Sequence, residues 1–502
     1  MNHSTVAAPD SRQRRLSTGI AGLDSVLGGG FPDNHLYLVE GDPGAGKTTL
    51  GLQFLLEGVK DGQKGLYITL SETSDELRTV AASHGWSLDG IDIFELVNDE
   101  GLSPDAEQSI LHPAEMELGE TTRGVMSAIE ELSPERVVFD SLSEMRLLAQ
   151  NPLRYRRQVL ALKRFFSQRN CTVLMLDDKT AEEGDQQLHS IAHGVVSMEQ
   201  CTEEYGPARR RLRVVKMRGV KFRSGEHDFN LDTGGIELFP RLVAAEHRAL
   251  TDSDVVSTGH SGLDHLLGGG LARGSNTLFS GPSGVGKTTT ALAVTRAALM
   301  RGERAVYYLF DEGLGTLLAR STALGLDVSP FLANGQLRLV ALDPAEVSPG
   351  EFAHMVRKAV EEEGARVVAI DSLNAYLQAM PGSKYLLLQM HELLTFLNQL
   401  NVITILVLGQ HGIVGEVRSD VDLSYLSDAI LLFRFFEARG NLLKAVSVVK
   451  SRTSQHELSI REFRLGATGV EVGEALIDFE GVLSGVPAYR GNMALLGDGE
   501  PG

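Results

Sequence analysis

The stretch Gly41–Thr49 reads GDPGAGKTT and satisfies the pattern G-x-x-x-x-G-K-[ST] at every defined position. The run His35–Glu40 before it predicts a strand, and Leu50–Val59 behind it has the apolar spacing of a helix. Between a strand and a helix, such a glycine loop turns backbone N–H groups toward phosphate oxygens, and the helix N-terminus adds a positive dipole end. The stretch therefore predicts a phosphate-binding P-loop, and this context argues against a chance match.

The residue types of the loop predict their roles. Lys47 would contact the β- and γ-phosphates of ATP, and the Thr48 hydroxyl would bind Mg²⁺. The residues expected to contact the nucleotide are Gly44, Ala45, Gly46, Lys47, Thr48 and Thr49.

The loop occurs a second time, as GPSGVGKTT at Gly281–Thr289. The lead-in is also repeated, because STGIAGLDSVLGGG at Ser17–Gly30 and STGHSGLDHLLGGG at Ser257–Gly270 are identical at ten of fourteen positions. Such a repeat predicts a duplicated domain. We expect the triplet Gly28–Gly30 to form a loop beside the nucleotide pocket. The second set of nucleotide contacts is Gly284, Val285, Gly286, Lys287, Thr288 and Thr289, with Thr288 on Mg²⁺.

The pattern of strands and helices predicts the domain organisation. Each repeat alternates strands and helices and contains buried strands, which predicts an α/β unit with a parallel sheet and nucleotide at the carboxyl ends of its strands. Residues 98–119 are acidic and are expected to form an exposed loop before a helix at Thr121–Leu132. The expected divisions are a flexible tail at 1–15, domains at 16–245 and 246–482, and a flexible tail at 483–502.

Composition limits the location of the protein. The content of 42% hydrophobic and 23% charged residues is typical of soluble globular chains. The two cysteines, Cys171 and Cys201, lack ligand spacing, which argues for a reducing compartment and against a zinc site. The N-terminus has no apolar core of a signal peptide, and no apolar run is long enough to span a bilayer. We therefore expect a cytoplasmic protein without membrane contact.

Each repeat also supplies a buried strand that ends in an aspartate. RVVFDSLSE at Arg136–Glu144 and RVVAIDSLN at Arg366–Asn374 place Asp140 and Asp371 at the carboxyl edge of a parallel sheet. This is the Walker B arrangement, in which the aspartate holds the Mg²⁺ shell.

Hydrolysis also needs a group that orients or deprotonates water. The strand after the P-loop helix is followed by Glu72 in the first repeat and by Asp311 and Glu312 in the second. These are the candidate catalytic acids, and Asp311 could also hold Mg²⁺. The alternative is that they cap the following helices.

Positive charge for the transferred phosphoryl group comes from a late strand of each repeat. The first repeat offers Lys216, Met217 and Arg218, and the second offers Lys450, Ser451 and Arg452. Such residues can act as arginine fingers across a subunit boundary. The alternative is a solvated strand end.

These residues together resemble the KaiC family, the double-domain RecA-like ATPases of cyanobacterial clocks and their relatives. The resemblance covers about residues 16–480 and implies two tandem RecA-like P-loop NTPase domains, each a mainly parallel sheet flanked by helices. It implies ATP and Mg²⁺ as cofactors and a homo-hexamer with ATP at subunit interfaces. It also implies nucleotide contacts at Ser83, Ser454 and His456.

The resemblance has two departures. The paired glutamates that the family usually has after the second strand are Ser71–Glu72 and Asp311–Glu312 here. In clock KaiC the second unit phosphorylates its own neighbouring serine and threonine. The matching positions here are Ser424, the expected phosphoacceptor, and Tyr425 in place of the threonine.

The function expected from the sequence is therefore an ATP-hydrolysing signalling protein with possible serine/threonine autokinase activity in its second domain and a signalling or clock-type protein partner. The alternative on the same fold is a DNA-dependent ATPase or recombinase. The net charge of −19 argues against nucleic-acid binding, whereas eight cations within Arg209–Arg223 argue for it. A third alternative is a nucleotide-sensing scaffold with little turnover.

Overall fold

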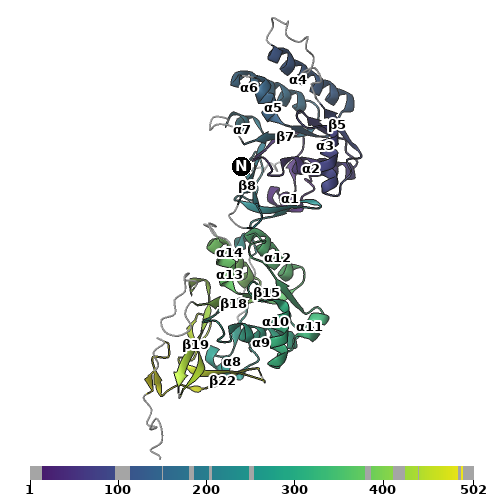
Figure 1. The fold of residues 1–502 in the computed structure, drawn as a ribbon. Coiled ribbons are helices and arrows are strands. Elements are labelled where there is room, and N and C mark those ends of the chain that lie inside the picture. The colour runs from purple at the N-terminus through teal and green to yellow at the C-terminus, as the bar shows by residue number, and fades with distance from the viewer. Residues whose placement is uncertain are drawn as a thin grey trace, which may run out of the picture. The chain divides into compact units, whose positions relative to one another are not determined.

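The computed structural model describes residues 14–95, 113–149, 151–179, 186–202, 206–247, 254–378, 386–410, 424–438, 440–467, 469–483 and 488–489. The chain divides into two compact units, 1–241 and 242–502. Figure 1 shows them in purple to teal and in teal to yellow.

The first unit is built on a nine-stranded sheet in the order β11-β10-β9-β8-β3-β7-β6-β4-β5. The strands from β8 to β5 pair in parallel, and β9, β10 and β11 extend the sheet as antiparallel neighbours. Their bounds are β3 Leu36–Gly41, β4 Gly65–Thr69, β5 Ile91–Glu95, β6 Arg136–Asp140, β7 Thr172–Asp178, β8 Gly194–Cys201, β9 Arg209–Met217, β10 His227–Asp232 and β11 Gly235–Phe239. A short pair, β1 Arg15–Leu16 and β2 Phe31–Pro32, lies outside the sheet.

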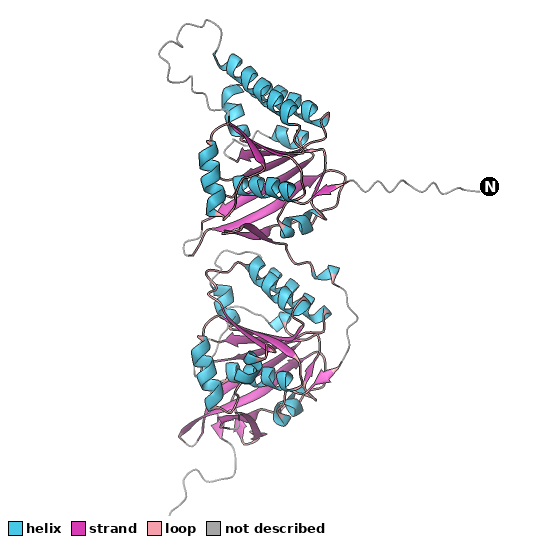
Figure 2. Cartoon of the chain, turned by 90° about the vertical axis from the view of Figure 1, so that its right-hand side faces the viewer, coloured by secondary structure: helices cyan, strands magenta, loops and turns pink. Residues whose placement is uncertain are grey.

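Helices cover both faces of this sheet (Figure 2). Alternation along β3 explains the layers, because Tyr37 and Val39 belong to the core of α1 and α2, whereas Leu36 and Leu38 belong to the core of α4, α5 and α6. The helices are α1 Ala21–Leu27, α2 Lys47–Lys60, α3 Ser74–Ser83, α4 Pro113–Leu132, α5 Leu142–Ala149, α6 Pro152–Ser167 and α7 Gln186–Ile191.

The second unit repeats this topology strand by strand, with its nine-stranded sheet in the order β16-β15-β17-β18-β14-β19-β20-β21-β22. Its strands are β14 Asn276–Gly281, β15 Arg304–Leu309, β16 Leu337–Ala341, β17 Ala365–Asp371, β18 Ile403–Gly409, β19 Ala429–Ala438, β20 Asn441–Ser451, β21 Arg461–Gly466 and β22 Gly469–Ala475. Two short pairs are β12 Val255–Val256 with β13 Leu271–Ala272, and β23 Phe479–Glu480 with β24 Ala488–Tyr489. Its helices are α8 Ser261–Leu267, α9 Lys287–Met300, α10 Leu314–Ala323, α11 Ser329–Ala333, α12 Pro349–Glu361, α13 Leu373–Gln378 and α14 Leu386–Gln399. The expected fold class of two tandem, mainly parallel α/β domains is confirmed.

Several details differ from the sequence-based expectation. Residues 113–119 are helical in α4 rather than part of an irregular loop, while 96–112 lie outside the described residues. Arg15 belongs to β1 and not to a tail, because it pairs with Pro32 and its guanidinium bonds two carbonyls. In the C-terminal segment, β24 pairs with β23, whereas the sequence predicted a flexible tail from residue 483.

The junction between the units differs as well. Leu242 and Ala244 pack into the core of the second unit, and η3 (Ala244–Glu246) spans the expected boundary between residues 245 and 246. The unit boundary at 241 therefore lies a few residues before the expected one.

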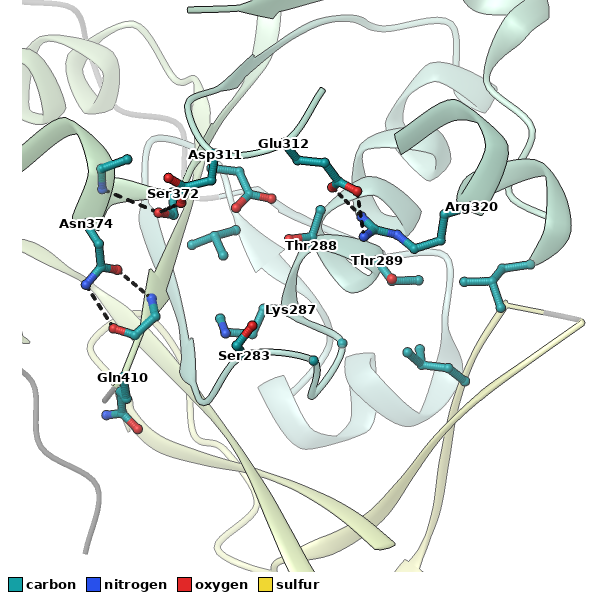
Figure 3. A pocket seen from close by; sticks show the side chains of 18 residues that line it. Ser283, Lys287, Thr288, Thr289, Asp311, Glu312, Arg320, Ser372, Asn374 and Gln410 are labelled. Carbon is teal, nitrogen blue, oxygen red and sulfur yellow. Dashed lines mark hydrogen bonds and ion pairs between the residues drawn. The ribbon is translucent and has the colours of Figure 1, made fainter. Parts of the chain in front are cut away.

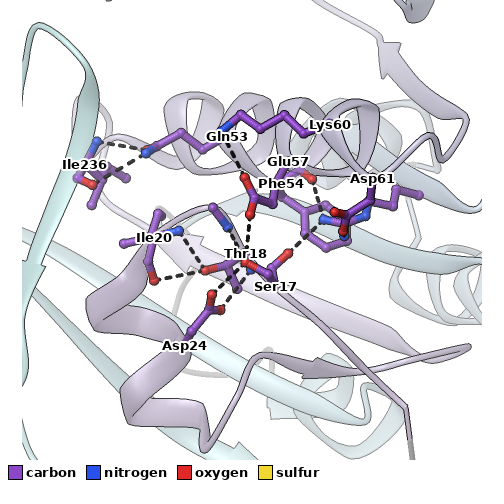
Figure 4. Close-up of polar contacts among 12 residues, drawn as sticks. Ser17, Thr18, Ile20, Asp24, Gln53, Phe54, Glu57, Lys60, Asp61 and Ile236 are labelled. Atoms are coloured by element: carbon purple, nitrogen blue, oxygen red, sulfur yellow. Dashed lines mark hydrogen bonds and ion pairs between the residues drawn. The ribbon is translucent and has the colours of Figure 1, made fainter.

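The repeated lead-in forms a turn that Asp24 stabilises (Figure 4). Ser17 Oγ donates to Asp24 Oδ2 at 2.7 Å, the Thr18 backbone N–H donates to Oδ1 at 2.8 Å, and Gly19 supplies a φ of 77°. Asp264 makes the equivalent bonds in the second unit. The motif is therefore a structural turn.

The glycine triplet after this turn serves packing. Gly28 ends α1 in the left-handed conformation, and a Cβ on Gly30 would meet the Leu16 carbonyl oxygen at 2.1 Å. Its second copy, Gly268–Gly270, is absent from the residues that line the second unit's cavity. The expected position of Gly28–Gly30 beside the nucleotide pocket of the first unit stays a prediction.

Candidate nucleotide sites

A cavity of about 540 Å³ opens at the carboxyl ends of the second unit's parallel strands (Figure 3). Its size is that of a site for a small organic ligand. The polar residues that line it come from the P-loop and α9, from the ends of β15, β17 and β18, and from α10. They include Ser283, Lys287, Thr288, Thr289, Asp311, Glu312, Arg320, Asp371, Ser372, Asn374 and Gln410. Of the residues predicted from the second loop, Gly284 and Gly286 also line the cavity, whereas Val285 is fully buried in the core.

The P-loop conformation follows from its glycines. Gly286 has a φ of 117° at the N-terminus of α9, a conformation that a side chain rarely adopts. Lys287 is buried, and its Nζ donates to the carbonyls of Gly281 and Pro282, each at 2.8 Å. Burial lowers the pKa of Lys287 to about 8, while the charge of Asp371 acts in the opposite direction. These two carbonyls therefore fix the ammonium group of Lys287 in the lining of the cavity.

The Walker B aspartates lie where the sequence placed them. Asp371 ends β17 beside Thr288 in the cavity, and Tyr307 donates its hydroxyl to Asp371 Oδ2 at 2.8 Å. In the first unit, Thr48 Oγ1 donates to Asp140 Oδ2 at 3.2 Å, and Tyr67 donates at 2.5 Å. Burial raises the pKa of both aspartates.

This donor set fits Mg²⁺. Each unit offers one threonine hydroxyl and one carboxylate, which are oxygen ligands, and Mg²⁺ usually completes its shell with waters and substrate phosphates. Within the described residues, no group of three or more His, Cys, Asp or Glu side chains could hold a metal by itself. The residues present therefore fit a magnesium ion that arrives with a nucleotide.

The acids of the second unit have different partners. Ser372 Oγ donates to Asp311 Oδ2, next to the Walker B aspartate. Glu312 accepts two hydrogen bonds from Arg320 of α10, at 2.9 and 2.8 Å. Both acids line the cavity, but neither caps α10, whose N-cap residue is Gly313.

Glu72 is the corresponding acid of the first unit. It lies beyond the end of β4, and its Oε2 is buried without a hydrogen-bond partner among the described residues. Burial, followed by the charge of Asp140, raises the pKa of Glu72. The helix-capping alternative is wrong here, because Thr73 caps α3 in a capping box with Glu76. A half-buried acid with a raised pKa beside the carboxylate of Asp140 is suited to general-base chemistry.

In the first unit, an ion pair joins the P-loop lysine to an aspartate at the end of β7. Lys47 Nζ donates to the carbonyls of Gly41 and Asp42 at 3.0 and 2.9 Å and lies 2.8 Å from Asp178 Oδ1. Of the remaining loop residues, Gly44 and Gly46 have positive φ, Ala45 is fully buried, and Thr49 Oγ1 lies 3.4 Å from His84 Nε2. Ser83, the neighbour of His84, is exposed at the end of α3.

The late-strand cations do not join the P-loop of their own unit. β8 runs parallel to β3 and β9 runs antiparallel to β8, so Met217 lies opposite Gly194 at the edge where β3 begins. The P-loop follows the other end of β3, about 17 Å away. Lys216 donates to the carbonyls of His189 and Ala192, Arg218 donates to Ser190, and Met217 is buried in the core.

The corresponding motif of the second unit is placed in the same way, because Ser451 lies opposite Ala429 where β14 begins. Lys450 donates to the Ser427 carbonyl at 2.6 Å, and Arg452 lies 3.8 Å from Asp428. Ser454 donates to the Leu267 carbonyl at 2.7 Å, and His456 follows in the same loop. None of these residues lines the described cavity.

Ser424 lies at this same edge, in the short helix η4 (Ser424–Leu426). The side-chain Nδ2 of Asn276, the first residue of β14, donates to the Leu426 carbonyl at 3.4 Å. Tyr425 is half exposed. The expected phosphoacceptor is therefore separated from its own unit's P-loop by the length of β14.

Sequence reasoning missed several residues at the sites. Arg320 and Asp178 bind candidate functional groups, and Tyr67 and Tyr307 hold the Walker B aspartates. In addition, Arg210 of β9 and Lys444 of β20 donate to the carbonyls of P-loop residues Gly44 and Gly284. The repeat was the one sequence signal that could have identified the two tyrosines. Tyr67 and Tyr307 are 240 residues apart, which is also the spacing between Lys47 and Lys287.

The basic stripe of Arg209–Arg223 is partly neutralised. Arg211 lies 3.4 Å from both Glu226 and Asp228, and Arg213 lies 3.9 Å from Glu199. These pairs weaken the argument for a nucleic-acid surface. No helix among the described residues has both the length and the apolar character that crossing a membrane requires.

Comparisons with known proteins agree with the duplicated architecture. A family model described as "ATPase: KaiC" matches residues 16–243 and again residues 256–477. Circadian clock protein KaiC3 of Synechocystis sp. is 26% identical over 486 residues, which is 95% of each chain. Circadian clock oscillator protein KaiC of Parathermosynechococcus lividus is 27% identical over 96% of this chain and 92% of its own. The KaiC of Prochlorococcus marinus strain SARG is 28% identical over 94% and 95%.

Proposed function

The chain belongs to the KaiC family of ATPases, and from that premise we propose that it binds and hydrolyses ATP in both units as part of a signalling system. The observation that supports this most directly is the repeated constellation of a P-loop lysine, a threonine beside a buried aspartate, and an acid after the next strand. The RecA-type DNA-dependent alternative is not favoured, since the family match covers both units.

The proposed reaction is transfer of the terminal phosphoryl group to water. Lys47 and Lys287 bind phosphate oxygens, and the helix N-termini of α2 and α9 add their dipoles. Mg²⁺, held by Thr48 with Asp140 or by Thr288 with Asp371, would neutralise charge on the phosphates. Glu72 in the first unit, and Asp311 or Glu312 in the second, would orient or deprotonate the attacking water.

We further propose a homo-hexamer with ATP between subunits. The support is the position of Arg218 and Arg452 at the sheet edge opposite their own P-loops, which prevents contact with their own nucleotide. A cation at that edge can serve a neighbour's phosphates as an arginine finger. Lys216, Met217, Lys450, Ser451, Ser454, His456 and Ser83 belong to this proposal as nucleotide contacts.

Autophosphorylation in the second unit is the finer part of the proposal. The acceptor is Ser424, which lies at the edge opposite Lys287 and would therefore meet the nucleotide of an adjacent subunit. The names of the relatives describe clock proteins, and we propose that a protein partner of signalling or clock type reads the nucleotide or phosphorylation state of this chain.

Turnover and intact mass test this function together. Phosphate release from ATP and Mg²⁺ is measured for the wild type, Lys47→Ala, Lys287→Ala and the double variant. We expect reduced release in each single variant and none in the double variant, and release that persists in the double variant would contradict the proposal.

Intact-mass measurement of the same samples tests the kinase part. We expect one added phosphate, which is lost in Ser424→Ala while phosphate release by the first unit continues. Label at another residue, or none with active hydrolysis, would leave the ATPase and remove the kinase. Sedimentation with and without ATP tests assembly, and identical monomer profiles would count against a shared site.

A further inference from the structure

The two units differ at one position beside the P-loop. In the first unit, Gly41 at the end of β3 pairs with Asp178 of β7, and in the second unit Gly281 at the end of β14 pairs with Gly409 of β18. The backbone continues alike in both, since Lys179 donates to Gly41 and Gln410 donates to Gly281, each at 3.0 Å. The same place in the fold thus has a carboxylate in one unit and no side chain in the other.

This carboxylate completes the hydrogen bonding of the P-loop lysine. An ammonium group has three N–H donors. Lys47 Nζ has three acceptors, the carbonyls of Gly41 and Asp42 and Asp178 Oδ1. Lys287 Nζ has two acceptors within the described part of the chain, the carbonyls of Gly281 and Pro282. One donor therefore remains for a phosphate in the second unit, whereas in the first unit all three are engaged.

The surroundings direct Asp178 to the lysine. The other acid at the end of β7, Asp177, is bound by Arg146 at 2.5 Å and by Ser143 at 3.0 Å. Ser143 Oγ also accepts a hydrogen bond from the backbone N–H of Asp178 at 3.1 Å, and it lies 3.5 Å from Asp178 Oδ2, so Oδ1 is the oxygen that pairs with Lys47. In the second unit Asn374 takes the place of Ser143 and holds both backbone groups of Gly409, at 2.6 and 3.0 Å. The first unit thus keeps a carboxylate beside its lysine and the second unit keeps its lysine open.

We propose that Asp178 determines the nucleotide affinity of the first site, as an internal counter-ion that the phosphates of a nucleoside triphosphate must displace from Lys47. The lysine is 9% exposed and Asp178 is 35% exposed, so the carboxylate can turn toward solvent while the lysine remains in place. Displacement leaves Asp178 close to bound phosphate, and like charges at short range oppose binding. The first unit therefore binds ATP less tightly than its P-loop alone would permit. This inference rests on the proposed ATP binding.

The test measures ATP binding to the first site of the full chain, with Lys287→Ala present to empty the second site. Equilibrium dialysis with labelled ATP and Mg²⁺ compares the ATP affinity of the chain that has Asp178 with the affinities of two variants. Asp178→Asn keeps the shape of the side chain and removes its charge, and Asp178→Gly copies the second unit. Both substitutions are expected to tighten binding at least fivefold. Glu199→Gln is the matched control, because Glu199 binds Lys179 rather than Lys47, and it should leave the affinity unchanged.

The reciprocal variant provides a second measurement. Gly409→Asp in a Lys47→Ala chain should weaken ATP binding to the second site at least fivefold. A Cβ at Gly409 would lie 3.3 Å from Asn374 Oδ1, a contact that a small side-chain movement relieves. If the Asp178→Asn and Asp178→Gly chains bind ATP with unchanged affinity, this inference is overturned while the proposed function stands. Absence of ATP from the first site in every chain would contradict the proposed function and with it this inference.

Discussion

Arg320 places its two terminal nitrogens on the two carboxylate oxygens of Glu312, at 2.9 and 2.8 Å. Among the described residues, the equivalent acid of the first unit, Glu72, has no such ion-pair partner, because Val80 occupies the helix position that corresponds to Arg320. The two units thus hold matching acids in different environments. Glu312 is held by a two-point ion pair with Arg320, whereas Glu72 is half-buried and has a raised pKa.

We expect Arg320→Met to increase ATP hydrolysis by the second unit. The substitution releases Glu312 from its ion pair, and partly exposed pairs of this kind contribute about 0.2–1 kcal/mol, which corresponds to at most about a fivefold rate change. The measurement is phosphate release in a Lys47→Ala chain, with Arg304→Met as a control on an exposed arginine away from the cavity. A decrease would instead show that Arg320 acts on the nucleotide.

Glu72→Gln should reduce hydrolysis by the first unit about 10²–10⁴-fold while ATP remains bound, because an amide cannot accept the proton of water. Since only the carboxylate is active and its pKa is raised, the wild-type rate should fall on acidification at a higher pH than for an ordinary glutamate. Rates are measured against pH in a Lys287→Ala chain. Glu76→Gln, which alters an exposed capping box, is the control, and equal losses in both variants would exclude a catalytic role for Glu72.

ATP affinity of the second site should decrease above pH 8. The pKa of Lys287 is about 8 in the unliganded chain, so the ammonium form that binds phosphate predominates below this pH and is lost above it. Binding above pH 8 then requires uptake of a proton, and affinity should fall by up to about tenfold per pH unit. Dialysis between pH 6.5 and 9.5 in a Lys47→Ala chain measures this. A constant affinity across that range would contradict the expectation.

Arg136→Met should destabilise the first unit by about 3 kcal/mol, because three buried or partly buried acceptors lose a charged donor. The guanidinium is fully buried and donates to the carbonyls of Ser17 and Phe54 and to Gln63 Oε1. Trp86 is the single tryptophan of the chain, so its fluorescence reports unfolding of this unit. Lys64→Met on the exposed surface is the control. An unfolding midpoint shared by both variants and the wild type would refute the estimate.

The parts of the sites that the sequence predicted are those set by local spacing. Lys47, Thr48 and their copies follow from the loop pattern, and Asp140 and Asp371 follow from buried strands that end in an acid. Partners that depend on the register between distant strands were not predictable. Asp178 reaches Lys47 because β7 pairs with β3, and this adjacency is not encoded in either segment.

Strand direction was the other unpredictable quantity. Arg218 and Arg452 were recognised as cations at strand ends, but the edge at which they lie depends on the antiparallel pairing of β9 and β20. Likewise, the repeated lead-in predicted a duplicated domain, but not the turn that Asp24 stabilises by accepting hydrogen bonds from Ser17 and Thr18. Sequence repetition therefore identified equivalent positions without distinguishing structural from functional ones.

The most direct measurement of the central claim is the number of nucleotides bound per chain at saturating ATP and Mg²⁺. Two complete P-loops predict two nucleotides in the wild type and one in each of the Lys47→Ala and Lys287→Ala variants, whereas Lys60→Ala on the exposed face of α2 should retain both. A wild-type value of one, or a single variant that retains two, would contradict the account of two independent sites.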